Sequence, residues 1–376
     1  MIRRNLRDII AKKVSKNGLG WLARRSQQYL LLHLSDLLHR PLCGPALGTI
    51  MVTYRCNYDC AMCDMPRKGA TQAMEGLQEF DTERFRRIIS EFARLGTAGI
   101  GFTGGEPLLR EDIFELLACT RKHGMIAHLN TNGYYLGDTE ARRIIEAGTD
   151  SVNISLDGAT PATHDRIRNR SGAFERAATA IDRLHRLRRQ QKSPLRLKIV
   201  AVIDETNIEE APELIHLSRE LGADSMDFIP RQPFAPNLSG SGNLPDDMLL
   251  ARVDRLVDAL LQAREEGASI ENSPAHLRLF RSSFAGRPSP VRCRAGYNSL
   301  AVDCYGRVFP CVPWINWGKF IANVQQGSLV DVWHSAEYQQ HRTVVSRCRD
   351  CYLNCQTELN LLFDPLAHLR IRWRKN

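Results

Sequence analysis

Three cysteines in one short stretch constrain this chain more than any other feature. Cys56, Cys60 and Cys63 follow an apolar run and have the spacing C-x3-C-x2-C. Thiolates are soft ligands that suit iron–sulfur clusters and zinc, and a loop of this length can hold three irons of a cubane [4Fe–4S] cluster. The fourth iron would then lack a protein ligand and could bind a substrate or cofactor. The alternative is a structural zinc loop, in which Asp64 could supply a fourth ligand.

Length and composition limit the class of protein. With 376 residues, 43% of them hydrophobic and 25% charged, the chain can bury one large core and a smaller second one. No apolar run is long enough to span a membrane, and the basic N-terminus lacks the apolar core of a signal peptide. Most of the 11 cysteines fall into two clusters, which favours metal binding in a reducing cytoplasm over secreted disulfides.

The net charge of +9 admits an acidic partner such as nucleic acid, anionic lipid or an acidic peptide. The excess lies mainly in residues 3–25, 183–192 and 370–375. Because runs of charge are more typical of solvated helix faces, we do not expect a nucleic-acid-binding protein. Residues 1–47 are basic, rich in leucine and predicted to be helical. We expect them to pack on the rest of the protein; the alternative is a surface-lying segment in peripheral contact with a membrane.

Strand and helix signals alternate along most of the chain. Apolar strands are predicted at 48–53, 99–102, 126–131, 151–155, 196–202 and 225–229, with helices at 81–95, 111–123, 139–147, 171–188 and 209–221. Six such units predict an α/β fold, a parallel sheet with helices outside that forms three-quarters of a TIM barrel. A loop is expected at 66–78, a linker or substrate loop at 232–243 and an amphipathic helix at 246–266.

Polar and glycine-rich segments follow the predicted strands at their carboxyl ends, the edge where ligands bind in parallel α/β folds. Glycines let the backbone approach a ligand closely, and a glutamate can accept from an ammonium group. The residues concerned are Thr103, Gly104, Gly105, Glu106, Asn132, Ser155 and Asp157, and Arg168 follows further along the chain. For Asn132, Asp157 and Arg168 the alternative is turn and capping chemistry. His123, at a helix end, and His128, within a strand, are expected to be structural.

A second set of cysteines lies near the C-terminus. Cys293 precedes a predicted hairpin with strands at 298–302 and 307–311, and the second strand ends in Cys311. Cys348, Cys351 and Cys355 follow with the spacing C-x2-C-x3-C. These thiolates are sufficient to ligate a second [4Fe–4S] cluster, and zinc is the alternative because four thiolates also suit it. Cys304, on the hairpin turn, is expected to be free.

The cysteine loop, its position after a first strand and the Gly-Gly-Glu-Pro motif at 104–107 resemble the radical S-adenosylmethionine (SAM) superfamily. The resemblance implies that Cys56, Cys60 and Cys63 hold a catalytic [4Fe–4S] cluster whose open iron binds SAM. Reductive cleavage of SAM then yields a 5'-deoxyadenosyl radical that abstracts hydrogen from a substrate. A partial (β/α)6 TIM barrel and a reductant such as flavodoxin or ferredoxin are implied as well.

The same resemblance implies a set of SAM-binding residues. The Gly-Gly-Glu-Pro motif would bind the amino group of SAM, and Arg168 is our choice for its carboxylate. Met62 stands where the family usually has an aromatic residue near the adenine, and its polarizable side chain can pack on a ring. The full predicted set is Met62, Thr103, Gly104, Gly105, Glu106, Asn132, Ser155, Asp157 and Arg168.

The C-terminal cysteines resemble the SPASM and shorter twitch extensions of radical SAM enzymes. We infer one auxiliary [4Fe–4S] cluster, because a full SPASM domain needs more cysteines and none follows Cys355. The first choice of ligands is Cys293, Cys311, Cys348 and Cys351, with Cys355 as a substitute. The expected domains are a basic helical extension (1–47), a radical SAM partial barrel (48–235), a linker with a barrel-closing helix (236–290) and an auxiliary cluster domain of hairpin and helix (291–376).

The expected function is that of a cytoplasmic radical SAM enzyme, and the substrate is open between two classes. The N-terminal extension is too short for a leader-peptide-binding domain, which favours oxidation, epimerisation or other tailoring of a small-molecule, sugar or lipid-linked substrate. A membrane-associated location would suit the last of these. The alternative is a peptide or protein maturase. A third class, a non-catalytic iron–sulfur or zinc scaffold that binds nucleic acid, is disfavoured because it would not need the Gly-Gly-Glu-Pro motif.

Overall fold

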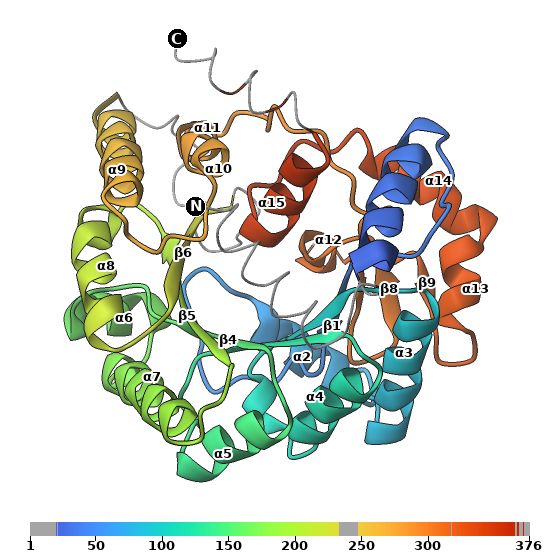
Figure 1. Ribbon diagram of the computed structural model, residues 1–376, viewed down its shortest axis with the longest axis horizontal. Coiled ribbons are helices and arrows are strands. Elements are labelled where there is room, and N and C mark those ends of the chain that lie inside the picture. Colours follow the sequence, from blue (N-terminus) through green and yellow to red (C-terminus); the bar gives the residue numbers. More distant parts are fainter. Residues whose placement is uncertain are drawn as a thin grey trace.

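A single curved sheet forms the centre of the protein in the computed structural model, which describes residues 20, 22–232, 247–316, 318–364, 367 and 371. The strand order is β6-β5-β4-β3-β2-β1-β7-β8-β9. Strands β1 to β6 pair in parallel, β7 joins β1 in parallel, and β8 and β9 are antiparallel. Helices cover the outside of the sheet (Figure 1). The predicted open, partial TIM barrel is therefore confirmed.

The elements follow the predicted alternation closely. The strands are β1 (Leu47–Met51), β2 (Gly99–Thr103), β3 (Ile126–Thr131), β4 (Ser151–Ser155), β5 (Arg196–Ile203), β6 (Ser225–Pro230), β7 (Ser299–Val302), β8 (Arg307–Phe309) and β9 (Ala322–Asn323). The barrel helices are α2 (Met65–Met74), α3 (Thr82–Arg94), α4 (Ile113–Lys122), α5 (Asp138–Glu146), α6 (Pro161–Arg168), α7 (Ala173–Gln190), α8 (Ala211–Glu220) and α9 (Asp247–Glu265). The later helices are α10 (Pro274–Arg278), α11 (Phe280–Phe284), α12 (Val312–Asn316), α13 (Leu329–His334), α14 (Ala336–Val345) and α15 (Asn354–Leu362).

Two local predictions differ from the structure. The prediction of a loop at 66–78 is wrong, because the helix α2 occupies residues 65–74. Pro66 stands in the first turn of α2, where its missing N–H is not needed, and Gly69 lets the helix approach Tyr54 closely. The helix α6 was not expected, and it begins where Thr160 accepts a hydrogen bond from Thr163 N. The linker expected at 232–243 lies almost wholly outside the described residues.

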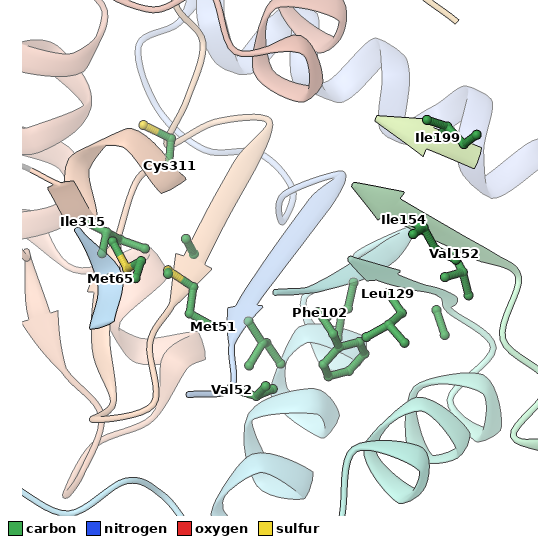
Figure 2. Packing of buried hydrophobic residues seen from close by; sticks show 14 of the residues in the cluster. Met51, Val52, Met65, Phe102, Leu129, Val152, Ile154, Ile199, Cys311 and Ile315 are labelled. Atoms are coloured by element: carbon green, nitrogen blue, oxygen red, sulfur yellow. The ribbon is translucent and has the colours of Figure 1, made fainter. Parts of the chain in front are cut away.

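The two faces of the barrel sheet differ in chemistry. Along β5, the alternate residues Leu197, Ile199 and Ala201 are fully buried in the core beneath the helices, whereas the residues between them are partly exposed. The strands β3 and β4 repeat this alternation. Figure 2 shows side chains of the apolar layer, among them Leu129 and Ile154. The core therefore lies between sheet and helices, and the inner face of the barrel remains open to polar side chains.

The cysteine-rich C-terminal part shares the barrel sheet. The predicted hairpin is present as β7 and β8, and β7 adds to the sheet beside β1. The Asp303 carboxylate in the turn accepts hydrogen bonds from Arg307 N at 2.9 Å and from Tyr54 Oη at 2.9 Å. Because Tyr54 directly precedes the cysteine loop, the hairpin turn is tied to the first cysteine set. The domain boundaries themselves remain a prediction.

The N-terminal helix, residues 22–37, packs on both halves of the molecule. The Gln28 amide donates to Gly96 O at 3.1 Å, and Asp36 forms ion pairs with Arg292 and Arg294 at 3.1 Å each. Residues 1–19, which complete the predicted extension, lie outside the described residues. Among the residues that are described, none of the helices has the length and apolar character required to cross a bilayer.

Candidate functional site

The Gly-Gly-Glu-Pro motif packs directly against the cysteine loop. Gly105 N donates to Thr53 O at 2.8 Å, and Glu106 N donates to Arg55 O at 2.8 Å. A Cβ atom at Gly104 would lie 2.2 Å from Thr53 O, and one at Gly105 would lie 2.0 Å from Arg55 O. Distances this short allow no side chain. The two glycines are therefore required by the contact between the end of β2 and the loop that carries the cysteines.

Glu106 joins the ends of β2 and β3. Its carboxylate is 1% exposed and accepts from Thr131 Oγ1 at 2.7 Å, from Asn132 N at 2.8 Å and from Leu108 N at 2.9 Å. Burial raises the pKa of Glu106, and the bonds from Asn132 and Thr131 partly oppose this rise. A carboxylate offers about four acceptor positions, so about one is left for the SAM amino group that the resemblance assigns to this motif.

Asn132 carries the connection from β3 to the cysteines. Its Nδ2 donates to Asn57 Oδ1 at 2.9 Å and lies 4.0 Å from Cys56 Sγ, while its Oδ1 accepts from Tyr134 N at 2.9 Å. The Asn132 side chain therefore stabilises the turn through Tyr134 N and also lies beside Cys56, a predicted cluster ligand. Hydrogen bonding around a sulfur ligand orients it and tunes the metal that it holds.

Arg168 and Asp157 form a buried ion pair next to the loop. Arg168 Nε lies 2.5 Å from Asp157 Oδ2, and Arg168 Nη1 lies 3.9 Å from Cys60 Sγ. Burial by itself would lower the pKa of Arg168, but the charge of the Asp157 carboxylate raises it above the ordinary value. Asp157 Oδ1 also accepts from Val202 N at 2.8 Å. A permanent cation is therefore held beside the cysteine loop, as the prediction for a carboxylate-binding arginine requires.

The three loop thiols are set in a largely buried environment. Burial raises the pKa of Cys56 to about 11, and it raises the pKa of Cys60 and of Cys63 as well. Tyr58 N donates to Cys56 Sγ at 3.5 Å. Thiols in such a place become thiolates when a cation binds, because the charge of the metal reverses the penalty of burial. The donor set and its shielding therefore fit a thiolate-bound cluster.

Met62 and Ser155 complete the predicted residues around the loop. Met62 packs with Cys56, Cys63 and Tyr134 around a small apolar cluster that contains Tyr58 and Cys60. Ser155 ends β4 and is partly exposed on the inner face. The structure thus places apolar surface at Met62, where the resemblance predicts the adenine, and leaves the position of Ser155 open to a ligand.

The second cysteine set is also brought together. Burial raises the pKa of Cys311 well above its ordinary value, and the nearby charges of Cys293, Cys351 and Cys348 raise it further. Cys355 also lies near this group, because its charge is one of those that raise the pKa of Cys351. After burial, the charge of Asp227 is the largest influence that raises the pKa of Cys355, to about 11. Within the described ranges, no three His, Cys, Asp or Glu side chains are grouped as they would be around one metal ion.

Cys304 lies away from both sets. It is fully buried in the hairpin turn, and after burial the charges of Asp303 and Glu79 raise the pKa of its thiol. Its carbonyl accepts a hydrogen bond from Phe80 N at 2.7 Å. The thiol therefore belongs to the packing between the hairpin and the barrel.

The inner face of the barrel carries polar residues that the sequence reasoning did not assign. Asn130, Asn153, Lys198 and Ser225 stand side by side in register on neighbouring strands, and the Asn153 amide donates to Asn130 Oδ1 at 3.0 Å. Lys198 Nζ lies 3.8 Å from the Glu271 carboxylate. Polar residues at every second position of these strands were the signal in the sequence. They remained unassigned because alternation alone does not say which face looks inward.

Asp227 and His128 lie on the same inner face. Burial raises the pKa of Asp227 to about 7, against the opposing charge of Lys198, and the Asp227 carboxylate accepts a hydrogen bond from the Asn354 amide. His128 is held by Ser151 at 2.6 Å and by Asn130 at 3.2 Å, and burial lowers its pKa to about 4. The imidazole of His128 is neutral near pH 7 and makes two hydrogen bonds, which agrees with the structural role expected for it.

Two protein-family models match this chain. The family model of the radical SAM superfamily matches residues 50–218, and that of an iron–sulfur cluster-binding domain, SPASM, matches residues 293–352. The chain belongs to the radical SAM superfamily. As a radical SAM enzyme with a SPASM domain, it is expected to use [4Fe–4S] clusters and SAM as cofactors.

Curated relatives of this radical SAM enzyme differ in their names. Over 311 residues, 78% of this chain and 83% of the relative, it is 26% identical to an AdoMet-dependent heme synthase from Methanosarcina barkeri. Over 290 residues, 75% of each chain, it is 28% identical to a PqqA peptide cyclase from Gluconobacter oxydans.

Solved structures share the fold. SuiB from Streptococcus suis, bound to S-adenosylmethionine, matches 88% of this chain and 75% of its own with a TM-score of 0.62 and 18% identity. Native anSMEcpe with bound AdoMet and Cp18Cys peptide matches 88% of this chain and 100% of its own with a TM-score of 0.60 and 17% identity. At these identities the two structures support the architecture and no more.

Replacing Gly105 by alanine should disable the site without unfolding the protein. The new methyl group would meet Arg55 O and push the cysteine loop away from β2. Because a displacement of about 1 Å can cost about a hundredfold in rate, we expect formation of 5'-deoxyadenosine to fall at least about tenfold in Gly105→Ala. The matched control is Gly101→Ala on the same strand, where the nearest atom lies 3.8 Å from the new Cβ. Equal losses in both variants would contradict the steric explanation.

His164 should make stability depend on pH. Its Nδ1 accepts from Asp157 N at 2.9 Å, and burial lowers its pKa from 6.5 to about 4. Between these values the unfolded state binds the proton more tightly, so stability is lost as the pH falls from 6.5 toward 4. The loss at pH 5 amounts to about 2 kcal/mol, at about 1.4 kcal/mol per pKa unit.

The variant His164→Asn keeps an acceptor for Asp157 N and removes the titration. Urea unfolding of wild type and variant at pH 7.5 and pH 5 should therefore show a smaller loss of stability on acidification in the variant. An identical loss in the two proteins would assign the pH dependence to other groups.

Proposed function

We propose that this radical SAM enzyme modifies a side chain of a peptide or protein. The observation that supports this substrate is the 28% identity, over three-quarters of both chains, with a protein named PqqA peptide cyclase. This relative favours the peptide alternative over the small-molecule, sugar or lipid-linked substrate that the sequence suggested first. The heme synthase relative keeps a non-peptide substrate as the competing outcome of the test below.

Cys56, Cys60 and Cys63 are the proposed ligands of the catalytic cluster, which when bound supplies the electron for reductive cleavage of SAM. Three features of the chain support this assignment. The Cys60 thiol is buried and those of Cys56 and Cys63 are partly buried, the Arg168 cation stands beside Cys60, and the loop is fixed to β2 by the backbone contacts of Gly105 and Glu106. A dry, preorganised site strengthens electrostatic interactions and excludes side reactions with water.

The proposed SAM contacts use what remains free around the loop. Arg168 is paired through Nε with Asp157, which leaves its other nitrogens for the carboxylate of SAM. The remaining acceptor position of Glu106 suits the SAM ammonium group, and Met62 offers a polarizable surface for adenine. Thr103, Gly104 and Asn132 line the same edge of the sheet.

Cys293, Cys311, Cys348 and Cys351 are the proposed ligands of one auxiliary cluster, which when bound supplies electron transfer. The mutual influence of their charges supports this choice, and Cys355, whose charge also acts on Cys351, is the proposed substitute.

The inner face is the proposed surface for the reacting group of the substrate. Asn153 and Lys198 can orient a polar side chain there, and Asp227, with a pKa raised to about 7, can hold or release a proton near neutral pH.

Iron content tests the assignment of the two cysteine sets. Wild-type protein, purified without oxygen and reconstituted, should hold about eight irons, as two cubane clusters require. The triple variant Cys56→Ala/Cys60→Ala/Cys63→Ala should hold about four irons and form no 5'-deoxyadenosine. The matched control Cys304→Ala, at a buried thiol outside both sets, should keep its iron and its SAM cleavage. Zinc in the triple variant, or unchanged SAM cleavage, would overturn the two-cluster assignment.

The substrate class can be tested by hydrogen transfer. Cells that contain the protein would be grown on deuterated amino acids, and their extract incubated with the reconstituted enzyme and unlabelled SAM. For a peptide substrate, deuterium should appear in 5'-deoxyadenosine, and prior protease digestion and size fractionation of the extract should abolish it. Deuterium transfer that survives protease and follows the small-molecule fraction would overturn the peptide proposal while leaving the radical SAM assignment intact.

A further inference from the structure

The N-terminal helix exposes leucines on the side that faces away from the protein. Leu30 is 63% exposed, Leu34 44% and Leu37 72%, and Leu38, just after the helix, is 56% exposed. Their spacing places them on one side of a helix. The opposite side carries Gln28, Leu32 and Asp36, which are buried against the barrel and the C-terminal part. We name Leu30, Leu34, Leu37 and Leu38 the leucine face.

A surface helix of a globular protein usually turns its apolar side inward and its polar side to solvent, and this helix does the reverse at the leucine face. Single exposed leucines are common at protein surfaces, but several on one stripe mark a site of interaction. The inner side of this helix is already satisfied by the contacts of Gln28 and Asp36. Among the described residues, the leucine face is therefore left exposed and can take a second apolar surface.

The exposed charges of the segment from residue 22 to residue 40 are positive. Arg24 and Arg40 are exposed at the two ends of the helix, with His39 beside Arg40. Asp36 is the only acidic residue between positions 22 and 40. Its carboxylate points inward and is paired with Arg292 and Arg294. No acidic side chain from this segment therefore opposes an anionic surface.

Both basic ends of the chain begin beside this helix. Residues 1–19, which precede it, contain six Lys or Arg and one Asp, and residues 365–376 contain four Lys or Arg and no acidic residue. The chain reaches the second segment through Leu362 and Phe363. Tyr29 Oη donates to Leu362 O at 3.1 Å, and the rings of Tyr29 and Phe363 stack at 4.9 Å.

We propose that the leucine face is a peripheral docking surface for an anionic membrane. The leucines would enter the boundary between headgroups and acyl chains, and the surrounding arginines would contact lipid phosphates. Charge decides between this occupant and a second copy of the chain. A symmetric dimer would bring the same positive surroundings of two copies together, whereas an anionic bilayer neutralises them. The proposal concerns attachment and is independent of the substrate class.

Vesicle flotation with the reconstituted holoenzyme tests the proposal. Wild type should float with vesicles of equal parts phosphatidylglycerol and phosphatidylcholine and remain behind with phosphatidylcholine alone. Added salt should weaken the binding, because exposed charges are screened. The variant Leu30→Ser/Leu34→Ser/Leu37→Ser should bind at least about tenfold more weakly, because the apolar area that enters the membrane is reduced. Met248→Ser, which changes an exposed apolar residue of α9 (76% exposed), is the matched control and should bind as wild type does.

SAM cleavage and iron content should be unchanged in the triple leucine variant, and this result would show that the variant is folded. Should they fall, the single variant Leu37→Ser, at the most exposed of these positions, takes its place. Light scattering after size-exclusion chromatography should show a monomer throughout. The proposal is overturned by absence of binding to anionic vesicles, by equal binding to neutral vesicles, by equal loss in the control, or by a wild-type dimer that the triple variant dissociates.

Discussion

The buried carboxylate of Glu106 is the interaction on which the rest of the site depends. It lies where β2 ends, and it accepts from the hydroxyl of Thr131 and the backbone N–H of Asn132 at the end of β3. Asn132 in turn reaches Asn57 in the cysteine loop. A buried acceptor that lost these donors would leave unpaired groups on both strands, at a cost of about 1–3 kcal/mol each. One carboxylate therefore fixes the relative positions of two strand ends and the loop.

Charge in this region is balanced before any cofactor binds. Asp157 is fully buried, and Arg168 compensates it from one side while standing close to Cys60 on the other. Removing one partner of a buried ion pair is strongly destabilising, so the pair is a rigid element rather than a pair of mobile side chains. The thiols bring negative charge only when a metal converts them to thiolates, and Arg168 is then already in place.

The two cysteine sets are held by one sheet. Strand β1, which leads into the first set, pairs with β2 on one side and with β7 on the other. Strand β7 belongs to the hairpin that leads to Cys311. The bond from Tyr54 to Asp303 joins the hairpin turn to the chain just before Cys56. A displacement of either set would therefore disturb the other. This arrangement suits an enzyme in which two redox centres must keep a fixed separation.

The sequence by itself determined the six parallel strand–helix units, because apolar strands and amphipathic helices alternate with clear periods. It also determined the two cysteine sets and the Gly-Gly-Glu-Pro motif, because their chemistry is written in local spacing. Only the tertiary structure decided that Cys355 lies near Asp227 of the barrel, that Glu106 is bonded chiefly to β3, and that residues 65–74 form a helix. It alone placed Asp227 and Lys198 on one inner face. These features depend on burial and on which strands become neighbours, and residues far apart in the chain meet only when the sheet has formed.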